Sequence, residues 1–203
     1  AQACGDTGPG RMLEPEAICG LIDQGSDGVL SGKTVVITAG PTREPIDPVR
    51  YISNHSSGKM GYALASAASK AGARVILVSG PVSLAPPVGV DVRPVTTAED
   101  MLREASNAVD EGCDLFIATA AVADYRPETC AGDKIKKSSE AMALSLVRNP
   151  DTLATIAGRD DAPFTVGFAA ETTDVASYAT DKMQRKKLNM IVVSDESDDG
   201  TDE

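Results

Sequence analysis

The sequence predicts an α/β fold: a Rossmann-like, mainly parallel sheet with helices on both faces. Short apolar runs alternate with segments of helical periodicity along most of the chain. Strands that are apolar throughout suit a parallel sheet that is covered on both sides. Aromatic residues make up 3% of the chain and apolar residues 42%, so the core must consist of small and branched aliphatic side chains, which suits helices packed on a sheet. At 203 residues, one substantial domain is expected.

The first predicted elements are a strand, a helix and a second strand. Thr34–Ala39 is an apolar, β-branched run that stops at Gly40-Pro41, and a long polar loop follows it. The Ala-rich segment Lys59–Ala71 predicts a helix that ends at Gly72. Arg74–Val78 is the next apolar run and predicts the second strand.

The same alternation continues after a proline-rich loop that contains Pro86-Pro87. The periodicity predicts three more helices, of which the middle one is short: Ala98–Asp110, Asp151–Ala157 and Val175–Lys187. It predicts strands at Val90–Val95, Asp114–Ala118, Ala141–Val147, Phe164–Phe168 and Met190–Val193. No internal repeat of solenoid period is present.

The chain divides into three parts by composition. Residues 1–32 are rich in Gly and Pro and have little periodicity, which predicts a segment or linker. Residues 33–193 carry the alternating strands and helices of the expected domain. Asp and Glu dominate residues 194–203, which predicts a solvated acidic tail.

Charge and cysteine content exclude several classes of function. A net charge of -11 argues against a nucleic-acid surface, which needs clustered Lys and Arg. The sequence lacks an apolar run of about 18 residues and a basic-then-apolar leader, so we expect neither a membrane span nor a secretory signal. The four cysteines form no CxxC pair, which makes zinc binding improbable and favours a reducing cytoplasm: Cys4, Cys19, Cys113 and Cys130.

Three long loops follow predicted strands, at residues 40–58, 118–139 and 168–174, and the switch-point rule predicts that they converge. In the first, Ser56-Ser57-Gly58-Lys59-Met60-Gly61 opens a helix, where N–H groups and the helix dipole can face an anion. We interpret Ser56, Gly58 and Gly61 as a phosphate cradle. The segment is neither a Walker A motif nor a GxGxxG fingerprint, so an ordinary helix start with small packing residues is an equal alternative.

Polar side chains in the same loop could act on an acyl or phosphoryl group. Arg43 and Arg50 can each clamp a carboxylate or phosphate through two parallel hydrogen bonds. The Asn54 amide can donate to an oxygen that gains negative charge. The chain's single histidine, His55, lies beside Asn54, but a lone loop histidine is more often a surface residue, and it receives no role as a base.

Charged residues in the later loops could hold a metal-bound polyphosphate. Asp124 follows the strand end at Ala118–Ala123, and Lys134 and its neighbours come soon after; Mg²⁺ binds one or two carboxylates together with phosphate oxygens. Lys182 and Lys186 are spaced i, i+4, so their like charges share one helix face and a bound anion would relieve the repulsion. Solvated charged loops and helix faces are the alternative, and by charge alone they are preferred.

Longer stretches make the sequence recognisable. Residues 37–61, ITAGPTREPIDPVRYISNHSSGKMG, closely resemble the signature of phosphopantothenoylcysteine synthetases. AAVADY at 120–125, KIKK at 134–137, NPD at 149–151 and GFAAET at 167–172 are similar to that family's other motifs, in the family's order. The resemblance covers about residues 33–193. Residues 3–12, with Cys4, resemble the end of the flavin-dependent decarboxylase that precedes the synthetase in bifunctional bacterial proteins.

The resemblance implies a ligase that joins 4'-phosphopantothenate to L-cysteine in coenzyme A biosynthesis. It implies CTP as the nucleotide, Mg²⁺, an acyl-cytidylate intermediate and a homodimer, with FMN confined to the decarboxylase half that is absent here. The matching positions assign Asn54, Arg50 and Lys134 to catalysis and Asp124 to the metal. They assign the CTP site to Ala118, Thr119, Ala120, Asp124, Lys134, Pro150, Asp151, Thr152, Leu153, Phe168, Lys182 and Lys186.

Two other readings remain open. Tyr178 and Lys182 fit the YxxxK pattern of short-chain dehydrogenases, but no glycine-rich dinucleotide turn follows the strand at 34–39. A catalytically weak nucleotide-binding subunit of the same family is the second. The family commonly has Asn where this chain has Ser194, and it continues where this sequence enters its acidic tail, which favours that second hypothesis. The presence of Arg50, Asn54 and Lys134 argues against it.

Overall fold

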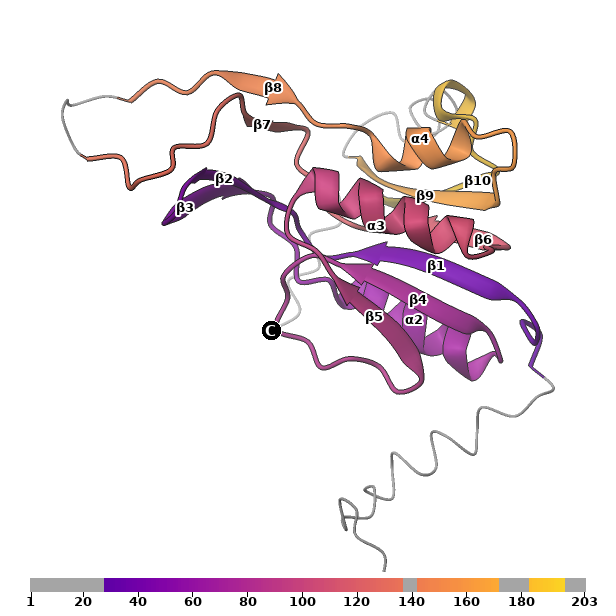
Figure 1. Cartoon of the computed structure of the whole chain (residues 1–203). Helices are drawn as coiled ribbons and strands as arrows, with labels where there is room; N and C mark the ends of the chain where they lie inside the picture. Colours follow the sequence, from indigo (N-terminus) through magenta and orange to yellow (C-terminus); the bar gives the residue numbers. More distant parts are fainter. Residues whose placement is uncertain (1–27, 137–141, 172–182, 196–203) are drawn as a thin grey trace, which may run out of the picture.

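The computed structural model describes residues 28–136, 142–171 and 183–195, with the side chains at 169–171 and 194–195 excepted. Its centre is a six-stranded sheet in which every pair of neighbours is parallel (Figure 1). The strand order is β10-β9-β6-β1-β4-β5, so the chain order reverses between β1 and β6. The strands are β1 (Thr34–Ala39), β4 (Arg74–Ser79), β5 (Val90–Pro94), β6 (Leu115–Ala118), β9 (Phe164–Glu171) and β10 (Met190–Asp195).

Helices cover both faces of this sheet, which confirms the predicted fold class. α2 (Lys59–Lys70) packs on one face, whereas α3 (Ala98–Asp110) and α4 (Thr152–Ala157) pack on the other. Successive side chains of β1 point to opposite faces. Val35 therefore contacts the α2 layer and Val36 the α3 layer, and both side chains are fully buried.

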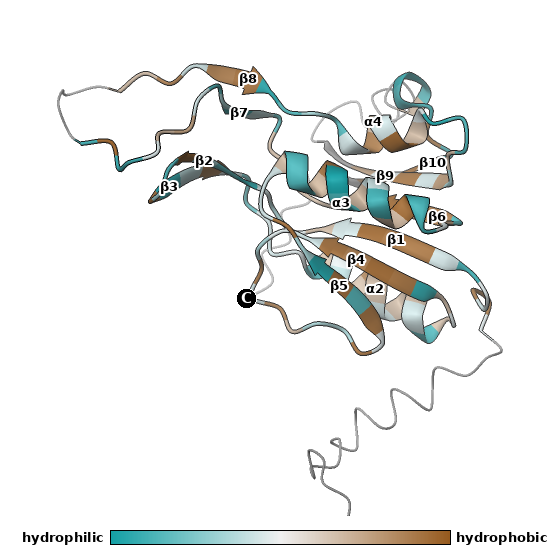
Figure 2. Ribbon diagram, viewed as in Figure 1, coloured by the Kyte–Doolittle hydropathy of each residue, from teal (hydrophilic) through white to brown (hydrophobic). Residues whose placement is uncertain are grey.

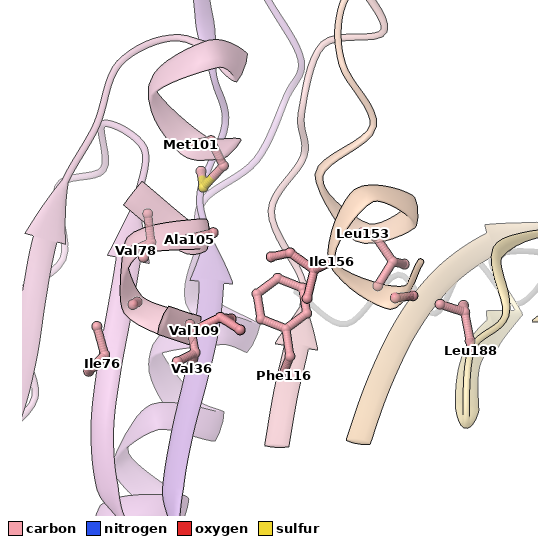
Figure 3. Packing of buried hydrophobic residues seen from close by; sticks show 12 residues of the cluster. Val36, Ile76, Val78, Met101, Ala105, Val109, Phe116, Leu153, Ile156 and Leu188 are labelled. Atoms are coloured by element: carbon pink, nitrogen blue, oxygen red, sulfur yellow. The ribbon is translucent and has the colours of Figure 1, made fainter. Parts of the chain in front are cut away.

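The α3 side of the core is centred on Phe116, a fully buried side chain of β6 (Figure 3). It lies between aliphatic side chains of α3, such as Val109, and Ile156 of α4. This packing explains why a chain with few aromatic residues can form a continuous core, because one large ring fills the space between two helices that meet the sheet through small side chains.

Local signals set the helix boundaries close to those predicted. α3 begins with a capping box, in which Thr97 Oγ1 accepts from the Asp100 N–H at 3.1 Å and the Asp100 carboxylate accepts from the Thr97 N–H at 3.1 Å. α2 ends at Lys70, and Gly72 follows it at φ +91°, a conformation that favours glycine. Asp151 precedes α4 and caps it by accepting from the Ala154 N–H at 3.0 Å.

Two antiparallel hairpins project from the carboxyl ends of the parallel strands (Figure 1). They are β2 (Arg43–Asp47) with β3 (Arg50–Ser53), and β7 (Tyr125–Pro127) with β8 (Leu146–Arg148). The sequence analysis expected loops over β2, β3 and β7, and it expected a strand that overlaps β8 at residues 146–147. That expected strand, Ala141–Val147, is wrong for the described residues 142–145. Those residues lie outside any strand because β7 offers a partner only three residues long.

The remaining predictions fall partly outside the described residues. Residues 175–182 of the expected helix at 175–187 are among these, and residues 183–186 are helical. Residues 28–33 lie against the end of α2, where the Leu30 N–H donates to Ala71 O at 2.9 Å. The division at residues 32 and 193 stays a prediction. Within the described ranges no helix is both long and apolar enough to cross a membrane.

Candidate active site at the strand switch point

The ends of β1 and β6 lie side by side where the strand order reverses. The Thr119 N–H donates to Thr38 O at 3.1 Å, and the Ala121 N–H donates to Gly40 O at 2.9 Å. Pro41 and Ala121 form a parallel bridge beyond the named strands. Two of the loops that the sequence predicted to converge, those after residues 40 and 118, are therefore joined at the place where such folds bind ligands.

Asn54 connects the hairpin to this switch point. It follows β3, and its side-chain Nδ2 donates to Val122 O at 3.1 Å. Ser53 Oγ, one residue earlier, donates to Thr42 O at 2.7 Å. The exposed Asn54 side chain is thus held against the loop that follows β6.

The first turn of α2 packs directly on the strand ends. Gly58 precedes the helix at φ +75° without a side-chain cap bond, and a β-carbon there would lie 2.8 Å from Val82 Cγ1. A β-carbon on Gly61 would lie 2.5 Å from Ala39 Cβ and 2.6 Å from Thr119 Oγ1. Close packing therefore accounts for Gly61, as the alternative interpretation of the segment held.

Hydroxyl groups surround the same helix start. Ser56 Oγ accepts from the Gly58 N–H at 3.3 Å, and Ser57 Oγ accepts from the Lys59 N–H at 3.4 Å. Ser56 and Ser57 also line a pocket of about 510 Å³ between the base of the β2–β3 hairpin and the loop at residues 81–84. The Arg43 guanidinium stacks on the Tyr51 ring in this pocket, 4.8 Å from the ring centroid.

Arg50 lies at the tip of the hairpin, away from Asn54. Arg50 is the first residue of the four-residue strand β3 and Asn54 follows its last residue, so the two lie about 13 Å apart along extended chain. Arg50 Nε pairs with Asp47 Oδ2 at 3.0 Å, and Arg50 Nη2 donates to Ile135 O at 3.4 Å. The structure thus brings Arg50 next to the segment that holds Lys134, and within one chain it separates both from Asn54.

Asp124 is an exposed residue between the switch point and the β7–β8 hairpin. The neighbouring backbone is fixed by Asn149, whose Nδ2 donates to Ala123 O at 2.8 Å and whose N–H donates to Asp124 O at 2.8 Å. The described part of the chain contains no group of three or more His, Cys, Asp or Glu side chains that could hold a metal. A single carboxylate suits Mg²⁺ that is held mainly by nucleotide phosphates.

The predicted nucleotide segment at Pro150–Leu153 opens α4. Thr152 and Leu153 are buried, so only their backbone could meet a ligand, whereas Asp151 is exposed. Lys186 Nζ pairs with Asp151 Oδ2 at 2.6 Å, and this contact brings together two predicted site residues. Phe168 is half-buried on β9, and Lys182 lies outside the described residues.

Sequence reasoning missed the buried carboxylates of Glu44 and Asp47, and the one that pairs with Arg50 is Asp47. Burial raises its pKa, but N–H bonds from Val49 and Ile135 and the charge of Arg50 outweigh that effect and hold the pKa below its usual range. The dipeptide Asp47-Pro48 is typical of a turn and could have indicated the hairpin. No local signal indicates its bond to Ile135.

Cys113, which lies just before β6, is half-buried. Burial raises the pKa of this thiol. Cys130 is exposed. Cys4 and Cys19 lie outside the described residues.

Comparisons with known proteins agree with these features. The family described as DNA/pantothenate metabolism flavoprotein C-terminal domain matches residues 30–202. The coenzyme A biosynthesis bifunctional protein CoaBC of Vibrio parahaemolyticus is 56% identical over 203 residues, which cover 98% of this chain and 51% of that protein. The Escherichia coli protein of the same name is 51% identical over 203 residues, and the match covers 97% of this chain and 50% of that protein. The chain spans about half the length of these curated relatives.

Solved structures show the same architecture. The crystal structure of the C-terminal domain of a CoaBC protein is 48% identical, with a TM-score of 0.72, and the match covers 81% of this chain and 78% of that one. The crystal structure of the DNA/pantothenate metabolism flavoprotein from Streptococcus pneumoniae is 22% identical, with a TM-score of 0.74. The match covers 84% of this chain and 86% of that one, which shows a shared fold. The resemblance drawn from the motifs is confirmed: this chain belongs to the DNA/pantothenate metabolism flavoprotein C-terminal domain family, and it matches the synthetase domain of bifunctional CoaBC proteins.

Proposed function

We propose that this chain is a phosphopantothenate–cysteine ligase that uses CTP in coenzyme A biosynthesis. The observation that carries the proposal is the docking of Asn54 on Val122 O at 3.1 Å, across the switch point between β1 and β6. This contact joins two of the stretches on which the family resemblance rests, at the sheet edge where doubly wound folds bind nucleotides.

The reaction needs two displacements. The carboxylate of 4'-phosphopantothenate attacks the α-phosphorus of CTP, and the bond to the β-phosphate oxygen breaks to release pyrophosphate. The cysteine amine then attacks the acyl carbon of the resulting acyl-cytidylate, loses a proton and expels CMP. Each step moves negative charge between phosphate and carbonyl oxygens, so oriented donors are the main expected source of rate.

The residues suit these tasks by chemistry. Asn54 has an amide N–H that can donate to the acyl phosphate region, and Arg50 can hold an anionic part of the substrate through two N–H groups. Lys134 is exposed and brings a positive charge toward the departing pyrophosphate. The N–H groups at the start of α2, with Ser56 and Ser57, would face the phosphates.

The remaining predicted positions belong to the nucleotide site. In it, Asp124 and the nucleotide phosphates would hold Mg²⁺, which neutralises phosphate charge when bound. The proposed CTP contacts are the backbone at Ala118, Thr119, Ala120, Pro150, Thr152 and Leu153 and the side chains of Asp151, Phe168, Lys182 and Lys186.

The proposed partners are a second copy of this chain and a flavin-dependent decarboxylase domain in the full-length protein. Exposed apolar side chains on the hairpins support the homodimer: Val49 is 59% exposed, Tyr51 50% and Leu146 46%. Figure 2 shows the apolar stretch along β8, away from the core of the sheet. The cytoplasmic location stays a prediction.

The test is pyrophosphate release by the purified chain with Mg²⁺, 4'-phosphopantothenate and either CTP or ATP, with and without cysteine. We expect release with CTP, and formation of the cysteine adduct and CMP only when cysteine is present. Asn54→Ala should lower turnover about 10²–10³-fold, since one donor to a developing oxyanion is worth that much. Asn107→Ala, which changes an exposed asparagine in the last turn of α3, is the matched control and should keep wild-type turnover.

The outcomes separate the alternatives. Saturable CTP binding without pyrophosphate release would favour the catalytically weak nucleotide-binding subunit. Release with ATP but not CTP would keep the ligase and overturn the nucleotide assignment. Equal loss in Asn54→Ala and Asn107→Ala would remove Asn54 from the site.

A further inference from the structure

Asp47 is a buried carboxylate at the tip of the β2–β3 hairpin, 2% exposed. Its Oδ1 accepts from the N–H groups of Val49 at 2.9 Å and Arg50 at 3.0 Å. These two bonds close the turn between β2 and β3, which is a common task for Asp in this position. One oxygen would suffice for that task.

The second oxygen serves another part of the chain. Asp47 Oδ2 accepts from the Ile135 N–H at 3.1 Å and pairs with Arg50 Nε at 3.0 Å. Arg50 Nη2 donates in turn to Ile135 O at 3.4 Å. The Ala131 N–H donates to Ile46 O at 3.0 Å and adds a further link between the hairpin and this segment.

This arrangement fixes one guanidinium and one backbone segment against each other. Ile135 is the direct neighbour of Lys134, and it lies 88 positions from Asp47 in the sequence. Arg50 uses its Nε and one N–H of Nη2 internally, which leaves the Nη1 side of the guanidinium for a ligand. Because the carboxylate is buried, solvent screens its bond to Arg50 less than it would a surface pair.

We propose that Asp47 is a positioning residue, which orients the Arg50 guanidinium and holds the backbone at Lys134 beside it, so that both cations are ready to bind anionic substrate. The inference rests on the proposed function. It assigns to Asp47 an effect on turnover through Arg50 and Lys134, in addition to its part in the hairpin turn.

Asp47→Asn tests this role with little change in volume. The amide keeps one oxygen acceptor and replaces the other with NH₂, so in either orientation one pair of N–H donors loses its acceptor. We expect turnover in the pyrophosphate assay to fall about 10–100-fold, as it does when positioned groups are slightly misplaced, while KM for cysteine, which neither cation is proposed to bind, changes less than about threefold. Amide exchange at Ile135 should become at least about tenfold faster.

Asp114→Asn is the matched control. Asp114 also joins a cation and a backbone N–H, through Lys33 Nζ at 2.8 Å and the Thr34 N–H at 2.9 Å, but it lies at the amino end of β1. We expect its turnover within about twofold of wild type. Turnover within twofold of wild type in Asp47→Asn, at faster Ile135 exchange, would overturn the proposal and leave Asp47 a turn residue only.

A second variant covers the case in which Asp47→Asn does not fold. Ile135→Pro removes the backbone N–H that donates to Asp47 Oδ2. The turn bonds from Val49 and Arg50 to Asp47 Oδ1 stay in place. It should lower turnover in the same sense, by about 3–10-fold, and unchanged turnover would overturn the link to the Lys134 segment. If the wild-type chain itself releases no pyrophosphate, the proposed function fails, and Ile135 exchange in Asp47→Asn alone decides whether the link exists.

Discussion

The parallel sheet and the two hairpins are held together by different forces. In the sheet, successive side chains such as Val35 and Val36 are fully buried against opposite helix layers, so burial of apolar surface stabilises the sheet. In the hairpins, Val49 and Leu146 are exposed. Hydrogen bonds to buried Asp47 and Glu44 fix the β2–β3 hairpin, and the Asn149 amide fixes the backbone just before β7. The comparison indicates that core substitutions will act on stability and that hairpin substitutions will act on the arrangement of the site.

The largest loss of stability should come from a substitution in the core of the sheet. Phe116→Ala removes a fully buried ring from between α3 and α4 and should lower the free energy of unfolding by about 3–5 kcal/mol. Urea denaturation followed by circular dichroism measures it. Phe164→Ala is the control, since that ring on β9 is 50% exposed and its loss should cost less than about 1 kcal/mol. Equal losses in the two variants would mean that Phe116 is not the centre of the core.

A smaller loss is expected where the core meets the site. Gly61→Ala should improve helix propensity, yet the added methyl would lie 2.5 Å from Ala39 Cβ and 2.6 Å from Thr119 Oγ1. Because backbone must move to relieve this, we expect a net destabilisation of about 1–3 kcal/mol by urea denaturation. At Gly132 a β-carbon would meet nothing within 4 Å, so Gly132→Ala should be neutral or slightly stabilising. A stabilised Gly61→Ala would contradict the close packing of α2 on β1.

The stability that Asp47 contributes in the β2–β3 hairpin should depend on pH. The pKa of Asp47 is lowered in the folded state, because N–H bonds and Arg50 favour its ionised form over the effect of burial. Its contribution to stability is therefore present above the unfolded pKa of about 4 and is lost as pH falls through the lowered folded value. Denaturation of wild type and Asp47→Asn at pH 7 and pH 3 should show a difference that shrinks at the lower pH. A difference that is constant with pH would show that the charge of Asp47 contributes nothing.

Sequence periodicity was enough to predict the sheet and failed for the hairpins. Strands such as Thr34–Ala39 are buried on both faces of the sheet, so they appear in the sequence as continuous apolar runs. β2 contains Arg43, Glu44 and Pro45, and β7 is only three residues long, so neither has the length or alternation that marks a strand. Tertiary contacts, such as the bond from the Ala98 N–H to Glu44 Oε1 at 2.9 Å, place the hairpin instead.

The site was predictable where topology determines it. The switch-point rule predicted that the loops after β1 and β6 converge, and Asn54 of the first loop contacts Val122 of the second; the roles of these residues stay predictions. The Asp47 link was not predictable, because its partner Ile135 comes from a distant segment. Burial of Thr152 and Leu153 was missed as well, since motif position says nothing about which way a side chain faces.

The smallest effect should come from Thr152, which lies in α4, outside both the sheet and the hairpins. It opens α4 in the predicted nucleotide segment, yet its Oγ1 is buried and has no hydrogen-bond partner among the described residues. Thr152→Val replaces an unsatisfied hydroxyl with a methyl of similar size, so stability should be unchanged or rise by up to about 1 kcal/mol. Thermal unfolding with and without CTP measures it, and the shift produced by CTP should equal that of wild type, because only the backbone at 152 could meet the nucleotide. A reduced shift would move the Thr152 hydroxyl from the core to the ligand, whereas a loss of stability without CTP would reveal a hydrogen-bond partner in the folded chain.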